Sequence, residues 1–150
     1  MSDLRELYQE VILDHGRRPR NFEVLEHAQC SADGRNPLCG DHCRIFVNLD
    51  GDVLKEIRFH GNGCAISTAS ASLMSQHLQG KTKTEAMEVF ECFHEMIAGA
   101  GTTETCTPRL GKLMVLEGVR AYPTRVKCAT LAWHTLKAAL ERPDSEVSTE

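Results

Sequence analysis

Three cysteines and one aspartate stand where the chain is expected to turn from one element into the next. Cys39 and Asp41 lie two residues apart in the stretch 36–41, NPLCGD, whose proline and glycine favour a tight turn before a strand. Cys64 follows the stretch GNG and precedes an expected helix, and Cys128 lies in the first turn of another. A helix start favours the thiolate form of a cysteine, which is the form that binds a metal. Together with the nearby thiol and carboxylate of the turn, these residues are typical of a metal–thiolate site.

The donor set of three thiolates and one carboxylate fits two kinds of centre. It suits a tetrahedral zinc site, and sulfur ligands with one oxygen also suit an iron–sulfur centre. The chain contains no CxxC pair, which argues against a zinc ribbon and a thioredoxin-like motif. Spacing alone is moderately specific, so the alternative that Cys39, Cys64 and Cys128 are buried structural cysteines stays open at this point.

The cysteine count is high and odd, at seven in 150 residues. A secreted disulfide framework favours an even count and an export signal, and the charged start SDLRE lacks the apolar core of a signal peptide. We therefore expect a cytoplasmic protein whose thiols stay free, which favours metal binding or thiol chemistry.

Four cysteines lie outside the proposed site. Cys43 forms a C-x3-C pair with the first ligand and is an alternative ligand by spacing, but it opens an expected strand and is assigned to the core or surface. Cys92 is expected to pack in the core and Cys106 to be exposed, while Cys30 receives no role. His60, just before the GNG stretch, is the one histidine considered as a supporting residue of the site.

Composition excludes several classes of protein. Apolar residues make up 41% and charged residues 25%, as in an ordinary globular protein, and the length fits one domain over residues 1–150. The net charge is −4 and no dense run of Lys and Arg is present, so no nucleic-acid partner is expected. No stretch reaches 18 consecutive apolar residues, so no membrane span is expected.

The elements that must position the site differ between the two halves of the chain. Apolar residues at helical spacing predict a helix over 3–14, and the proline-containing residues 15–22 predict a loop. Alternating polarity predicts strands over 43–49 and 53–60, joined by a DG turn that favours a hairpin. Residues 24–32 are a further candidate strand.

The second half is predicted to be helical, with a polar and loose tail over 142–150. The helices are expected over 65–79, from a TKTE capping box at 82 to about 98, over 110–118 and over 126–141. We therefore predict an α+β domain, in which helices pack on one face of a small antiparallel sheet of about three strands.

Four ordered stretches of the chain resemble a known family. It is similar to the U-type iron–sulfur cluster assembly family, the IscU and NifU N-terminal fold, over Leu7 to about Leu140. The stretches are NPLCGD at 36–41, GNGCAIS at 61–67, ASASLM at 69–74 and RVKCA at 125–129.

Within that family the chain looks most like the SufU branch. Lys127 stands immediately before the last cysteine, where an IscU-type scaffold carries a histidine, and Arg125 also resembles SufU. The Pro-Pro-Val-type chaperone recognition loop is absent, and residues 99–119 form a longer insertion ahead of the last helix. Leu38 departs from a frequent threonine but is not a ligand.

The resemblance implies a function for the site. In the SufU branch the positions matching Cys39, Asp41, Cys64 and Cys128 bind zinc, and the protein accepts persulfide sulfur from a SufS-type cysteine desulfurase. The expected role is that of a sulfurtransferase-like partner that serves a downstream iron–sulfur scaffold. The alternative is a scaffold on which a transient [2Fe–2S] cluster is assembled and transferred, and a third interpretation is a structural zinc module.

A mechanistic hypothesis assigns roles within this set. A closed four-ligand site hides its thiolates, so we expect the docked desulfurase to supply a replacement ligand and release one cysteine. Cys39 is the expected sulfur acceptor because it lies on a glycine-flanked loop that can swing. Arg125 and Lys127 are expected to stabilise the negative charge of a thiolate or persulfide.

Overall fold

The sheet and the helices follow one another in the expected order. The computed structural model describes residues 2–148, with side chains described from residue 6 onward. Its elements are α1 (Ser2–Arg17), β1 (Cys30–Asn36), β2 (Asp41–Asp50), β3 (Val53–Asn62), α2 (Ala65–Leu78), α3 (Lys83–Ala98), α4 (Cys106–Leu110), the 3-10 helix η1 (Gly111–Ala121), α5 (Pro123–Glu141) and β4 (Ser145–Ser148).

The four strands form one mixed sheet in the order β3-β2-β1-β4. β1 and β2 pair antiparallel, as do β2 and β3, whereas β4 runs parallel to β1. The predicted hairpin is confirmed, and Gly51 takes a positive φ of 61° in its turn. The predicted α+β fold is confirmed, but the sheet has four strands instead of about three, and the tail that was predicted to be loose supplies the one parallel strand. Residues 145–148 form the fourth strand by pairing with the open edge of β1. These backbone hydrogen bonds stabilise a strand although the residues are mostly polar.

The first strand lies later in the chain than predicted. Its range is Cys30–Asn36, whereas the prediction placed it over 24–32. The strand is rich in small and polar residues, so it carries little alternating apolar signal. Gly34 shows why a small residue belongs there, because a Cβ at this position would clash with Thr135 of α5. Close packing of the helix on the strand therefore selects glycine.

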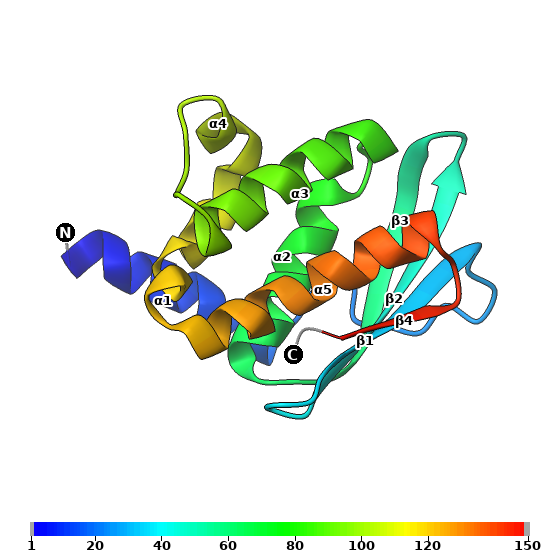
Figure 1. Cartoon of the computed structure of the whole chain (residues 1–150), viewed down its shortest axis with the longest axis horizontal. Coiled ribbons are helices and arrows are strands. Elements are labelled where there is room, and N and C mark those ends of the chain that lie inside the picture. Colours follow the sequence, from blue (N-terminus) through cyan, green and yellow to red (C-terminus); the bar gives the residue numbers. More distant parts are fainter. Residues whose placement is uncertain (1, 149–150) are drawn as a thin grey trace.

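The helices cover one face of the sheet, as predicted. α5 packs against β1 and β2, and α2 packs against β3 (Figure 1). The buried strand residues Ile45, Val47 and Ile57 join the main core with helix side chains. Within it the rings of Phe93 and Trp133 stack with centroids 4.2 Å apart. This core fixes the ends of the elements that carry the candidate ligands.

The helix boundaries agree with the local sequence signals. Thr82 and Glu85 form the predicted capping box at the start of α3. The last helix begins at Pro123, three positions before the predicted start at 126, because proline suits the first turn of a helix. The helix predicted over 110–118 is the 3-10 helix η1, and the short α4 precedes it. In the part of the chain that the structure describes, no helix is long and apolar enough to span a membrane.

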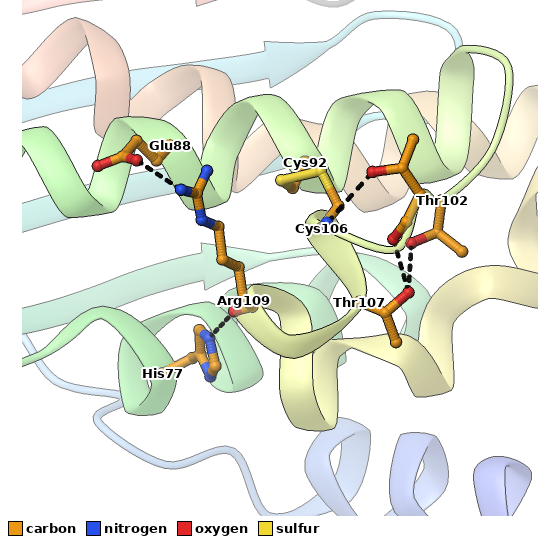
Figure 2. Close-up of a disulfide and its surroundings, with 8 residues drawn as sticks. His77, Glu88, Cys92, Thr102, Cys106, Thr107 and Arg109 are labelled. Carbon is orange, nitrogen blue, oxygen red and sulfur yellow. Dashed lines mark hydrogen bonds and ion pairs between the residues drawn. A yellow bond between two sulfur atoms is a disulfide. The ribbon is translucent and has the colours of Figure 1, made fainter.

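Two cysteines outside the predicted site form a disulfide. Cys92 of α3 and Cys106, the first residue of α4, are joined with Cα atoms 5.3 Å apart (Figure 2). The expectation that all thiols stay free was therefore wrong, as was that of an exposed Cys106, which is half-buried. The tertiary packing of α4 on α3 brings the two together. Cys92 is buried in the core, as predicted.

Candidate metal centre

Three segments of the chain bring the four predicted ligands to one place. Cys39 lies in the turn between β1 and β2, and Asp41 is the first residue of β2. Cys64 is the N-cap residue of α2. Cys128 lies in the second turn of α5, and not in the first as predicted, because that helix begins earlier. The side chains therefore meet where the start of β2, the N-terminus of α2 and the second turn of α5 converge.

The distances among these side chains fit a single small cation. The Sγ atoms of Cys39 and Cys128 are 3.7 Å apart. A tetrahedral site with zinc–sulfur bonds of about 2.3 Å has a sulfur–sulfur edge of about 3.8 Å. Ligand atoms of Cys39, Asp41 and Cys128 all lie within 4.8 Å of one another. Cys64 Sγ lies 3.7 Å from Asp41 Oδ2, at the edge of this group. The four donors are of the types that zinc prefers, and the spacing of Cys39, Asp41 and Cys128 fits one ion, with Cys64 next to Asp41.

Asn36 organises the turn that carries Cys39. Its backbone carbonyl accepts hydrogen bonds from the N–H groups of Cys39 at 3.3 Å and Gly40 at 2.8 Å. Its side-chain Oδ1 accepts the N–H of Leu38 at 3.2 Å. Gly40 has a φ of 77°, a conformation that glycine adopts at low cost. Asn36 is not among the predicted site residues, although asparagine at the start of a turn is a recognisable signal.

Asp41 links the strand to the helix that begins at Cys64. The aspartate is 4% exposed, and its Oδ1 accepts the backbone N–H of Cys64 at 3.0 Å. Cys64 Sγ in turn accepts the N–H of Ser67 at 3.5 Å, as an N-cap side chain does. One carboxylate oxygen thus fixes the backbone of α2, while the other faces the thiol.

Burial and neighbouring groups favour the protonated form of Cys128. Burial, followed by the negative charge of Cys64, raises the pKa of the Cys128 thiol. The sequence prediction that the helix start and nearby cations would favour its thiolate was therefore wrong for the site without a metal, because desolvation of the charged form dominates. A bound cation would reverse this balance, so metal binding should release protons.

Arg125 faces the sulfur atoms, and Lys127 does not contact them. Hydrogen bonding to Cys128 and the charge of Cys64 raise the pKa of the exposed Arg125 guanidinium. Lys127 is half-buried, and among the described residues it makes no hydrogen bond or ion pair with the site. The apolar side chains of Leu38 and Tyr122, 71% and 64% exposed, belong to the same two segments as Cys39 and Arg125.

The remaining candidates lie outside the cluster. Cys43 is buried in the core, and burial, with the charges of Asp33 and Asp41, raises its pKa to about 12. This agrees with its assignment to the core. His60 is exposed and packs on the ring of Phe22, with ring centroids 4.7 Å apart.

Comparisons with known proteins place this site in a family context. The model of the NifU-like N terminal domain family matches residues 7–129. The chain is 38% identical to the zinc-dependent sulfurtransferase SufU of Bacillus subtilis, over 95% of both chains. It is 40% identical to the iron–sulfur cluster assembly scaffold protein IscU of Streptococcus pyogenes, over 95% of this chain and 87% of that one.

A solved structure shares the fold. The chain superimposes on the putative SUF-system scaffold protein SufU of Fervidobacterium islandicum with a TM-score of 0.82 and 36% identity. The alignment covers 91% of this chain and 98% of that structure. Since the SufU and IscU relatives are almost equally similar, overall identity leaves the choice between the two activities to the chemistry of the site.

Proposed function

This chain belongs to the NifU-like N-terminal domain family of iron–sulfur cluster assembly proteins, and from that premise we propose that it is a zinc-dependent sulfur acceptor. Its donor would be the persulfide of a SufS-type cysteine desulfurase, and its sulfur would pass to a downstream iron–sulfur scaffold. The observation that carries the proposal is an exposed thiol, Cys39, 3.7 Å from the buried sulfur of Cys128.

The four residues of the cluster would hold the zinc. Bound zinc keeps thiolates deprotonated without oxidising them. Cys39, Asp41, Cys64 and Cys128 supply the three sulfurs and one oxygen that a tetrahedral site needs. Of these, Cys64 is fixed at the start of α2 and Cys128 within α5, so neither can move without disturbing a helix.

Cys39 is the residue that can meet a donor. Its side chain is exposed, and its turn is hinged on Gly40 with positive φ. In the transfer step the Cys39 thiolate attacks the outer sulfur of the donor persulfide. A new sulfur–sulfur bond forms on Cys39, the bond between the two donor sulfurs breaks, and the donor cysteine leaves as a thiolate. Cys39 then carries the persulfide.

Two basic residues support this step to different degrees. Arg125 faces the sulfurs of Cys128 and Cys64, so its guanidinium is placed to stabilise a developing thiolate or persulfide charge. Lys127 would add positive charge near the site without contacting a sulfur. An IscU-type scaffold carries a histidine at this position, so a lysine here favours sulfur transfer over cluster assembly.

The second candidate function is a scaffold that builds a transient [2Fe–2S] cluster. The 40% identity to the streptococcal IscU favours it, and the same thiolates suit a cluster as cargo. Metal analysis separates the two. We expect aerobically purified protein to be colourless with about one zinc per chain, as a closed tetrahedral site would hold. A brown protein containing iron and sulfide would support the scaffold instead.

The transfer itself is tested by desulfurase turnover. A SufS-type desulfurase is assayed for alanine formation from cysteine, with and without this protein, under a reductant. We expect Cys39→Ser to reduce the stimulation by at least about tenfold, since the acceptor thiolate is lost. Cys30→Ser, which changes a half-buried cysteine outside the cluster, is the matched control. Full stimulation by Cys39→Ser would contradict the assignment.

A further inference from the structure

The Cys92–Cys106 pair is separate from the cysteines of the metal centre. The ligand positions lie at the β1–β2 turn and at the starts of α2 and α5, whereas this pair joins α3 to α4. Figure 1 shows α4 and the β1–β2 turn at opposite ends of the molecule. The other five cysteines are free in the structure. The molecule therefore contains two thiol systems that do not share a residue.

The disulfide is the main tether of an otherwise weakly held segment. Residues 102–107 make hydrogen bonds among themselves, such as Thr102 with Thr107 at 3.1 Å and Cys106 N–H with Thr103 Oγ1 at 3.2 Å (Figure 2). In the described part of the chain, no hydrogen bond or ion pair joins residues 102–107 to α3. Only the sulfur–sulfur bond does so.

Just after this segment, Arg109 makes one ion pair with α3 and one hydrogen bond with α2, and buried anchoring follows. Arg109 Nη2 pairs with Glu88 of α3 at 3.1 Å, but both side chains are more than 40% exposed. Exposed ion pairs of this kind contribute little to stability. The Arg109 carbonyl accepts a hydrogen bond from His77 Nε2 at 2.7 Å. Buried anchoring begins at Leu110 and continues through Leu113 and Leu116 of η1.

We propose that Cys92 and Cys106 form a reversible thiol-oxidation site that fixes residues 102–109 to α3 when oxidised and releases them when reduced. The difference in burial gives the two cysteines different roles. Cys106 is half-buried at the start of α4, so it can meet a small reagent, whereas Cys92 is buried on α3 and can react only with its neighbour. The first is the attacking cysteine and the second the resolving one.

A small-molecule disulfide is the oxidant that balances the reaction. The Cys106 thiolate attacks one of its sulfurs, forms a mixed disulfide and expels one small thiolate. The Cys92 thiolate then attacks the Cys106 sulfur, closes the protein disulfide and expels the second small thiolate. The two protons of the cysteine thiols end on the expelled thiolates, and a dithiol reverses the reaction. In a compartment that keeps thiols reduced, such a bond is transient and responds to the redox state.

The release should stay local. η1 follows α4 and leads into α5, but its residues Leu113, Leu116 and Val119 are buried in the main core. Reduction therefore loosens residues 102–109 without moving Arg125 or Cys128. The zinc content of the protein is expected to be the same in both redox states.

The test uses the zinc-loaded full-length protein equilibrated with reduced or oxidised glutathione. Thiols are counted by alkylation and mass spectrometry, a peptide map identifies linked cysteines, and limited trypsin digestion measures cleavage after Arg109. Oxidised wild type should contain the Cys92–Cys106 peptide, and its cleavage after Arg109 should be at least about tenfold slower than in the reduced protein. Zinc is measured in the same samples.

Two variants provide the comparison. Cys106→Ser should be cleaved after Arg109 at the reduced wild-type rate in both buffers, and Cys30→Ser should respond to oxidation as wild type does. If a variant folds poorly, the peptide map and the cleavage rates of the wild type still test whether the disulfide forms and whether it restrains residues 102–109. The proposal is overturned if oxidation links other cysteines first, or if cleavage after Arg109 is equally fast in both states. Because neither readout involves a desulfurase, the result is independent of the proposed function.

Discussion

Two pairs of sulfur atoms lie close together in this protein, and they differ in what surrounds them. The Sγ atoms of Cys39 and Cys128 are 3.7 Å apart beside the Asp41 carboxylate, with Arg125 facing the cluster. Cys92 and Cys106 are bonded to each other, and among the described residues no hydrogen bond reaches their sulfurs. A carboxylate and a third thiol favour a cation, whereas an isolated pair of thiols favours a bond between them.

The two pairs also differ in how they are held in the fold. The cluster is built from segments far apart in the sequence, joined by buried polar contacts such as Asp41 Oδ1 with the N–H of Cys64. The disulfide closes a separation of 14 residues, of which residues 98–105 are exposed or half-buried. Disturbing the first should affect the metal and the fold together, whereas disturbing the second should remain local.

The largest expected effect is the loss of metal from the cluster. Cys128→Ser removes a buried sulfur of the proposed ligand set, and we expect zinc affinity to fall by at least about a thousandfold, since zinc sites depend on their full ligand set. Zinc is measured by metal analysis and competition with a chelator. Cys106→Ser is the matched control and should keep about one zinc per chain. Equal zinc loss in both variants would show that the Cys39–Cys128 pair is no more important for zinc binding than the disulfide.

Acid should weaken the half of the molecule that carries the cluster. Burial, with the charges of Arg20 and Lys112, lowers the pKa of His15 from 6.5 to about 4. Nδ1 of the buried ring lies 2.7 Å from the hydroxyl oxygen of Ser72 on α2, and the backbone N–H of Arg20 donates to the same oxygen at 2.8 Å. The unfolded chain binds the proton of His15 more tightly than the folded chain does. The contribution of the neutral, buried ring to the unfolding free energy is therefore complete above about pH 6.5 and is lost as the pH falls toward 4.

The expected loss is about 2 to 3 kcal/mol of unfolding free energy between those pH values. Denaturant unfolding at several pH values measures it, and His15→Asn should flatten the dependence. His27→Asn changes an exposed histidine and should leave the dependence as in the wild type. An unchanged slope in His15→Asn would show that another group controls acid stability.

A smaller effect is expected from the turn that carries Cys39. Asn36→Ala removes the hydrogen bond from the Leu38 N–H and should lower the unfolding free energy by about 1 kcal/mol. The looser turn should also speed zinc loss to a chelator. Asn48→Ala, on the same sheet but distant from the turn in register, should lower stability without changing zinc release. Identical release rates in the two variants would mean that Asn36 does not restrain Cys39.

The smallest effect belongs to the surface ion pair beside the disulfide. Glu88→Gln removes the partner of Arg109, and we expect a change below about 0.5 kcal/mol, because both side chains are exposed. Thermal unfolding of the oxidised protein measures it. A loss several times larger would mean that α4 is held by its ion pair as much as by its disulfide.

Local sequence signals predicted the regular elements well where they were strong. The DG hairpin, the capping box at Thr82 and the apolar spacing of the helices all correspond to elements of the structure. Prediction was wrong for β1 and β4, whose small or polar residues form strands through pairing and through α5 packed on Gly34. Such strands depend on partners that no local window contains.

The sequence by itself determined which residues offer metal-binding chemistry, because Cys39, Asp41, Cys64 and Cys128 stand in turn and helix-start motifs that resemble those of a known family. Only the tertiary structure decided which side chains are neighbours: that Cys128 joins Cys39, that Asn36 and Asp41 hold the surrounding backbone, and that Cys106 meets Cys92. Ligand type is a property of each residue, whereas distance, burial and the resulting pKa are properties of the packed chain.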